Sequence, residues 1–197
     1  MQINKPYNTL QNISVGSKEI NAARVAFFLP GFVISTWAPM IPMVKARLKL
    51  EADVLGLLLL CIGISAFIFM PLAGALVQRF GCKKVVITGA TLMALISVLL
   101  SCLPNIWSYA IALAFFGAVM GATDVSMNTN AVIVEKLAGR RLLSGMHAFW
   151  SIGCFASAGL FSVLASSGLN VTLIATLHCA IVLALLAVFG RHLLDYK

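Results

Sequence analysis

Six long apolar runs constrain this chain more than any other feature of its sequence. They cover roughly residues 25–44, 54–77, 85–103, 106–134, 146–167 and 169–190. An apolar run of about 18 residues or more is long enough to cross a bilayer as a helix. Because lipid offers no hydrogen-bonding partner, the backbone of such a run must bond internally, which favours helices over isolated strands. The sequence therefore predicts an all-α membrane protein with six transmembrane helices.

The composition and the connections agree with one membrane domain. Hydrophobic residues make up 61% of the chain and charged residues 10%, whereas soluble domains carry about 25% charged residues. The polar start lacks the short apolar core and cleavage site of a signal peptide. We expect a polar tail at 1–21, a transmembrane domain at 22–190 and a short end at 191–197. Short loops make neighbouring helices antiparallel, and 45–53 (KARLKLEAD) is expected to be the longest outer loop.

Prolines in the first apolar run predict where its helix changes direction. Pro30 and Gly31 favour a bend, because proline removes a backbone hydrogen bond inside a helix. Pro39 and Pro42 are expected to end the helix for the same reason.

Basic residues are distributed unevenly over the two sides of a six-helix layout. The net charge is +8, yet eleven of the fourteen lysines and arginines fall on the side of the two termini. The three on the opposite side are Lys45, Arg47 and Lys49. The positive-inside rule then places both termini in the cytoplasm, with a bacterial inner membrane as the expected location. The positive charge indicates membrane orientation rather than nucleic-acid binding.

The five cysteines are scattered singly, without CxxC or Cys/His spacing. This pattern predicts neither a disulfide framework nor a metal site, and we expect no cofactor.

The fourth apolar run is interrupted by polar residues at its centre, in the stretch FFGAVMGATDVSMNTNAVIVEK at 115–136. At about 100° per residue, small and polar side chains form one narrow stripe: Gly117, Gly121, Asp124, Asn128, Ala131 and Glu135. Asn130 falls outside the stripe and is expected to bond to another helix. With a rise of about 1.5 Å per residue, Asp124 lies roughly 15 Å from Val134, within the hydrocarbon core.

A carboxylate at that depth costs on the order of 2.5–3.5 kcal/mol, and three interpretations explain how the cost is offset. Asp124 lines a water-filled cavity and binds substrate or a proton, or pairs with a neighbouring helix, or stays protonated in a helix–helix hydrogen bond. The small residues beside it favour the cavity. Glu135, near the membrane surface, is expected to form an ion pair with the basic residues that follow.

Two histidines lie in the last two apolar runs. His147 shares a helix face with Ser151, Cys154 and Ala158, so it either relays protons to Asp124 or bonds to the preceding loop. His178 is expected to be a packed, hydrogen-bonded core residue.

The second connection carries a recognisable signature. The segment GALVQRFGCKK contains, in order, Gly74, Arg79, Gly81, Lys83 and Lys84. Gly81 suits a left-handed turn after a helix end, and the lysines suit an anionic membrane surface. The spacing resembles the loop between helices 2 and 3 of the Major Facilitator Superfamily. Gln78 stands where that family usually has an aspartate of its gating network.

The fourth and fifth helices extend this resemblance. The stretch GAVMGATDVSMNTNAVIVEK and the following AGRRLLSGMHAFWSIGCFASAGL look like those of the fucose-permease-like and related branches. The resemblance implies sugar contact at Asn128, whose amide offers donors and acceptors to a hydroxylated ligand. It also implies that helix 1 lines a cavity, so Trp37 either stacks on a sugar or marks the outer membrane interface.

The resemblance implies twelve helices in two halves, and this chain looks like the N-terminal half. Its triplets 1–3 and 4–6 are candidates for an inverted repeat, since Gly31/Ser35 and Gly117/Gly121 are spaced alike. The expected function is transport of a small polar solute by alternating access, with proton coupling through Asp124. The missing half is a second copy, a separate six-helix chain, or absent from a truncated product. The alternatives are a membrane scaffold and, less consistent with the motifs, a membrane enzyme.

Overall fold

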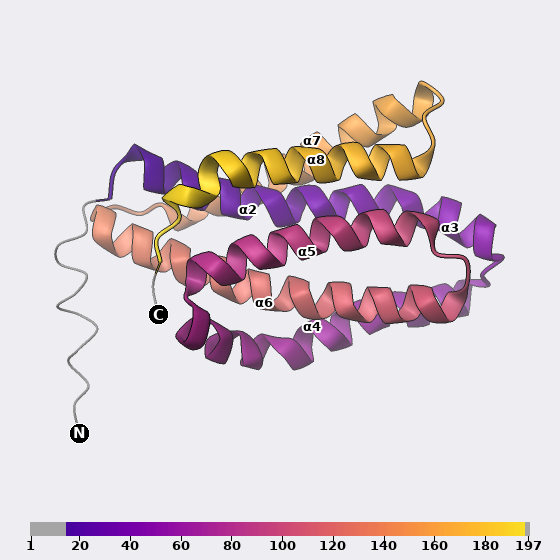
Figure 1. Ribbon diagram of the computed structural model, residues 1–197, viewed down its shortest axis with the longest axis horizontal. Coiled ribbons are helices and arrows are strands. Elements are labelled where there is room, and N and C mark those ends of the chain that lie inside the picture. Colours follow the sequence, from indigo (N-terminus) through magenta and orange to yellow (C-terminus); the bar gives the residue numbers. More distant parts are fainter. Residues whose placement is uncertain (1–14, 196–197) are drawn as a thin grey trace.

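The computed structural model describes residues 15–195 as a bundle of long helices (Figure 1). The elements are α2 Ser17–Trp37, η1 Ala38–Met40, α3 Ile41–Leu48, α4 Ala52–Phe80, α5 Cys82–Cys102, α6 Ile106–Ala138, α7 Leu143–Ser166, α8 Val171–Phe189 and η2 Gly190–His192. Counting α2 to α3 as one segment, six helices are long and apolar enough to cross a membrane. No strand occurs within residues 15–195. The predicted all-α fold with six membrane helices is confirmed.

The helices extend beyond the apolar runs at both ends of the bundle. α2 begins at Ser17, where the carboxylate of Glu19 accepts a hydrogen bond from the N–H of Gly16 at 2.8 Å. At the other end, Pro39 lies in the short turn η1, and α3 then continues to Leu48. The expected outer loop at 45–53 is therefore mostly helical, with residues 49–51 as the connection. Polar helix turns form there because their side chains reach the aqueous side.

Local sequence explains where several helices start and stop. The side-chain oxygens of Asn105 and Asn170 accept from backbone N–H groups three residues ahead, capping α6 and α8. Gly139 ends α6 with φ of 64°, a left-handed conformation that glycine adopts without strain. Gly81 joins α4 to α5 with φ of 89° and ψ of 149°, a region open essentially to glycine alone. The helix ends at Gly81 with a positive φ, as expected, but the predicted left-handed helical turn is wrong because ψ lies far outside that region.

The helices associate as two close pairs, and α5 and α8 form a third, less extensive pair. α2 packs most extensively against α7, and α4 against α6, while α5 contacts both α6 and α8. Figure 1 shows α5 between α6 and α8 along the length of the bundle. The lengths differ: α6 has 33 residues and α4 has 29, whereas α5 has 21 and α8 has 19.

In both close pairs, a glycine allows the two helix backbones to approach one another closely. A Cβ placed on Gly31 of α2 would collide with the backbone oxygen of Trp150 in α7. A Cβ on Gly117 of α6 would collide in the same manner with the backbone oxygen of Ile62 in α4. Each glycine lies in the first membrane helix of one triplet and contacts the second membrane helix of the other triplet. The two contacts thus occupy equivalent positions in the two triplets, and the inverted repeat itself stays a prediction.

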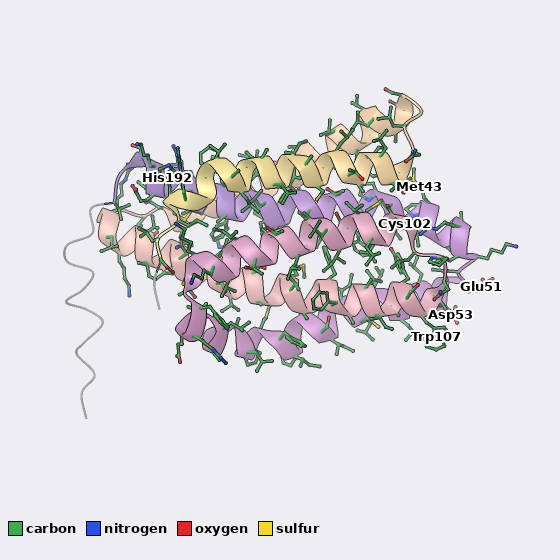
Figure 2. The ribbon with its side chains drawn as sticks, in the orientation of Figure 1. Met43, Glu51, Asp53, Cys102, Trp107 and His192 are labelled. Carbon is green, nitrogen blue, oxygen red and sulfur yellow. The ribbon has the colours of Figure 1, made fainter. Side chains whose placement is uncertain are left out.

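The two ends of the bundle differ in charge. Glu51, Asp53 and Trp107 lie together at the end where α3 is found, and His192 lies at the opposite end (Figure 2). Near His192, Leu193 packs in an apolar cluster with Ile20, so the start of α2 and the segment after α8 share one end. That end also carries the basic connection at Gly81. We call it the basic end.

Candidate functional site

Asp124 and Asn128 form a polar pair on one surface of α6. Both side chains are half-buried. The amide nitrogen of Asn128 donates to the backbone oxygen of Asp124 at 2.9 Å and lies 3.4 Å from its carboxylate oxygen. The pair spans one helical turn, as the predicted stripe requires. The carboxylate is therefore held by its own helix and remains partly open to the surroundings.

Three other polar residues of α6 differ from this pair because they are buried. Thr123 and Ser126 are fully buried, and each hydroxyl donates to a backbone oxygen one turn earlier, at 2.7 Å. Asn130 is also buried, and its amide nitrogen donates to the backbone oxygen of Leu194 at 2.9 Å. Asn130 thus bonds outside its own helix as expected, but its partner lies in the segment after η2 and not in another helix. Asp124 and Asn128 are thus distinguished by their exposure as well as by their chemistry.

His147 adds a titratable group from a second helix. It lies in the first turns of α7 and is close enough to Asp124 for their charges to interact. Its imidazole packs edge-on against the ring of Phe27 in α2, with 4.9 Å between ring centroids. The side chain is exposed in the described part of the chain. Residues from α2, α6 and α7 therefore meet around one polar surface.

The predicted stripe on α6 does not form one continuous wall. Gly117 and Gly121 are buried against the backbone of α4, and Ala131 is fully buried in the apolar cluster with Ile20. A helical wheel gives angles about one axis, but the neighbours of a 33-residue helix change along its length. The polar surface is consequently limited to the turns around Asp124 and Asn128.

Trp37 lies in the core and not at either of its expected places. Its side chain is 6% exposed, and its indole N–H donates to the hydroxyl of Tyr109 at 2.9 Å. Buried tryptophans usually find such a partner. The residue links α2 to α6 rather than presenting a free ring face or an interfacial anchor.

Glu135 caps the following helix. One oxygen of its carboxylate accepts from the N–H groups of Leu142 at 2.6 Å and Leu143 at 2.8 Å. The first N–H groups of a helix have no partner inside it, and a carboxylate also interacts favourably with the positive end of the helix dipole. The structure therefore gives this side chain a capping role in place of the expected ion pair.

We expect Glu135→Ala to destabilise the bundle by about 1 kcal/mol, the usual effect of losing a helix N-cap. Glu135→Gln keeps an acceptor oxygen and should retain most of the stability. Thermal unfolding in detergent measures both, with Lys136→Ala as an exposed neighbour for comparison. Equal melting temperatures for the alanine variant and the unsubstituted protein would contradict the capping role.

The basic connection holds the segment that follows α8. The ammonium group of Lys83 donates to the backbone oxygen of Arg191 at 2.7 Å. Arg79 lies over the ring of Phe80, with 5.3 Å from its guanidinium carbon to the ring centroid. Gly74 and Gln78 are exposed on α4, and Lys84 is exposed on α5. In this part of the chain, the residues predicted as a gating loop have one defined contact outside their own connection, that of Lys83.

A buried polar network was only partly visible in the sequence. His178 is 1% exposed, as expected of a core residue, and its ring nitrogens lie 2.9 Å and 3.2 Å from the backbone oxygens of Ile174 and Ser157. The hydroxyls of Ser157 and Thr36 lie 2.9 Å apart. The network joins α2, α7 and α8. The role of Ser157 in this network could not be predicted from the sequence, because single serines are common where membrane helices pack together.

Comparison with known proteins gives a consistent result. A family model described as Major Facilitator Superfamily matches residues 25–195. The chain is 42% identical to an uncharacterised MFS-type transporter of Yersinia pestis over 179 residues, which cover 90% of this chain and 47% of the relative. It is 34% identical to the membrane protein MosC of Rhizobium meliloti over 145 residues, covering 74% and 36%. It is 36% identical to an uncharacterised transporter of Sinorhizobium fredii over 132 residues, covering 67% and 35%. The chain thus spans about half or less of each relative's length.

Proposed function

The chain belongs to the Major Facilitator Superfamily, and on that premise we propose that it forms half of a transporter for a small polar solute. It is an integral membrane protein. The proposed mechanism is alternating access, in which two six-helix halves rock around a site between them. The proposed orientation puts the basic end in the cytoplasm of a bacterium, because basic residues concentrate there.

The observation that carries this proposal is the half-buried pair Asp124 and Asn128. An ionisable residue inside a membrane helix indicates function by default, because its desolvation must be offset. A scaffold role would favour a dry contact between helices, yet the hydrogen-bond partner of this carboxylate belongs to its own helix. We propose that the surface around the pair is one wall of the solute path.

The side chains on this wall suggest how solute and proton are handled. Asn128 provides both donors and acceptors, which suits hydroxyl groups such as those of a sugar. Asp124 is the proposed proton carrier, and the imidazole of His147 is the proposed relay toward the basic end. These roles rest on placement: His147, in the first turns of α7, lies near enough to Asp124 of α6 for their charges to interact.

The second wall must come from another six-helix unit. Either a second copy of this chain or a different six-helix segment supplies it. Light scattering of the purified protein in mild detergent measures the oligomeric state, and uptake by vesicles made from the same preparation measures activity. We expect a dimer, or a complex with a second membrane protein, that takes up one member of a panel of labelled sugars, amino acids and organic anions. A monomer that transports none of them would count against a half-transporter that works through self-association.

A further inference from the structure

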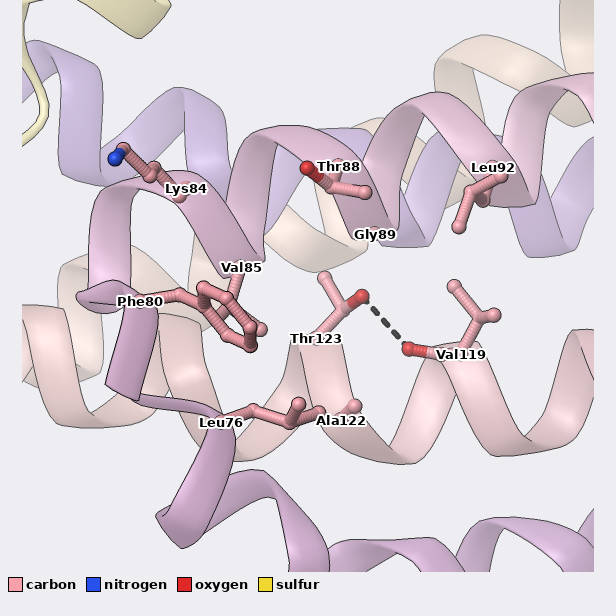
Figure 3. Close-up of a pocket in the computed structure, with 10 residues that line it drawn as sticks. All are labelled: Leu76, Phe80, Lys84, Val85, Thr88, Gly89, Leu92, Val119, Ala122 and Thr123. Atoms are coloured by element: carbon pink, nitrogen blue, oxygen red, sulfur yellow. Dashed lines mark hydrogen bonds between the residues drawn. The ribbon is translucent and has the colours of Figure 1, made fainter. Parts of the chain in front are cut away.

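A hollow separate from the polar pair opens between α4 and α5, with α6 as its floor. Its volume is about 380 Å³, within the range of about 300–1,000 Å³ typical of small-molecule sites. Figure 3 shows the side chains around it, from Phe80 and Lys84 at one end to Leu92 and Val119 at the other. The lining residues are Leu76, Phe80, Lys84, Val85, Thr88, Gly89, Leu92, Val119, Ala122 and Thr123. We call it the α4–α5 groove.

The groove exists because α4 and α5 both pack on α6 but only slightly on one another. Gly89 brings α5 against α6, since a Cβ there would collide with the hydroxyl of Thr123. No comparable contact draws α4 toward α5 beyond their connection at Gly81, as far as the structure describes the chain. From Lys84 to Leu92 the groove follows α5 over nine residues, a rise of about 12 Å along the helix.

The chemistry of the lining suits hydrocarbon over most of its length. Thr123 contributes a hydroxyl, but that group already donates to Val119 at 2.7 Å. Thr88 is the other hydroxyl, and Lys84 is the one charged residue among the lining residues. None of the six acidic residues of the chain lines the groove.

Positive charge gathers where the groove reaches the basic end. Lys84 lines that end and is exposed. The guanidinium of Arg79 lies over the ring of Phe80, which is itself part of the lining. The neighbouring Lys83 is engaged with Arg191. A ligand that complements this arrangement has an anionic group at the membrane surface and a hydrocarbon tail directed inward.

We propose that the α4–α5 groove binds an anionic phospholipid, with one acyl chain between α4 and α5 and its phosphate beside Lys84. The groove is partly open on the outside of the bundle, and its charged end lies at the membrane surface that the proposed orientation makes cytoplasmic. Negative lipids are abundant in that leaflet and attract basic groups near it. The site lies apart from the pair at Asp124, so this proposal does not depend on transport.

Lipid binding to the purified 197-residue chain tests the proposal. Phosphatidylglycerol and phosphatidylcholine with identical acyl chains are added in detergent, and bound lipid is counted by native mass spectrometry. We expect phosphatidylglycerol to bind more tightly. Lys84→Gln should raise its Kd about fivefold, the effect of one lysine at an anionic surface. Thr88→Phe should fill the groove and abolish retention of both lipids.

Two matched variants separate the groove from general effects. Lys136→Gln removes an exposed basic residue of α6 at the same end, and Leu95→Phe enlarges an exposed residue of α5 outside the groove. Both should bind phosphatidylglycerol like the unsubstituted chain. Equal losses in the two glutamine variants, or unchanged retention in Thr88→Phe, would overturn the proposal. Competition by inorganic phosphate that removes phosphatidylglycerol would also overturn it, because the hydrocarbon would then contribute nothing.

Discussion

Asp124→Asn is expected to abolish proton-driven accumulation of the solute while leaving the bundle folded. The amide is nearly the same size as the carboxyl group and still meets Asn128, but it cannot take up or release a proton. Removing a carboxylate from the membrane interior also removes an insertion cost of about 2.5–3.5 kcal/mol. Stability should therefore hold or increase. Loss of activity in this variant would then report on function and not on folding.

The measurement is uptake of the transported solute by vesicles that contain the complete transporter, with and without a pH gradient. In the asparagine variant, the gradient should have no effect on accumulation, and exchange of solute across the membrane should persist. Glu135→Gln is the control, because it neutralises another carboxylate of the same helix that serves as a cap. If Asp124→Asn accumulates solute with unchanged pH dependence, the coupling role is wrong.

The second large effect concerns the contact between α6 and α4. Gly117→Ala is expected to destabilise the bundle by about 1–3 kcal/mol, the usual cost of overpacking. The added Cβ would meet the backbone oxygen and the Cα of Ile62, and neither can rotate away as a flexible side chain would. The two helices would have to separate along their closest contact.

A glycine-to-alanine substitution at Gly63, one residue beyond Ile62, should stabilise the bundle instead of destabilising it. Gly63 of α4 has open space around the position of a Cβ. Alanine there gains helix propensity of about 1 kcal/mol without a collision. Thermal unfolding in detergent should move the melting temperature down for Gly117→Ala and up for Gly63→Ala. Shifts in the same direction would contradict the assigned packing.

The positions of the membrane helices could be predicted from the sequence because hydrocarbon thickness imposes a minimum run of apolar residues. The ends of the helices could not be predicted in the same way. Hydropathy locates only the part of a helix that lies in the hydrocarbon, and the helix continues beyond it into the polar region. α2 starts at Ser17, eight residues before the first apolar run, and α3 includes the charged residues Lys45 and Arg47. The outer loop expected there was therefore wrong for most of its length.

The polar residues of the candidate site could be picked out from the sequence, but their neighbours in space could not. The conspicuous carboxylate at Asp124 pointed to one turn of α6 as the candidate site, and this assignment stays a prediction. Its neighbours depended on which helix lies opposite each turn, and for this reason Gly117 is buried against α4 while Asn128 is half-exposed. The capping role of Glu135 requires α7 to fold back over the end of α6. No local pattern in the sequence encodes that approach.

The unequal helix lengths have a consequence for the surrounding membrane. α6 is about 50 Å long and α4 about 43 Å, against a hydrocarbon thickness of about 30 Å. α5, at about 31 Å, and α8, at about 28 Å, match that thickness without excess. The long helices must tilt or protrude, and the short ones leave no margin for a thicker bilayer. A thicker membrane would therefore create hydrophobic mismatch first at α5 and α8, whereas the long helices could span it by tilting less.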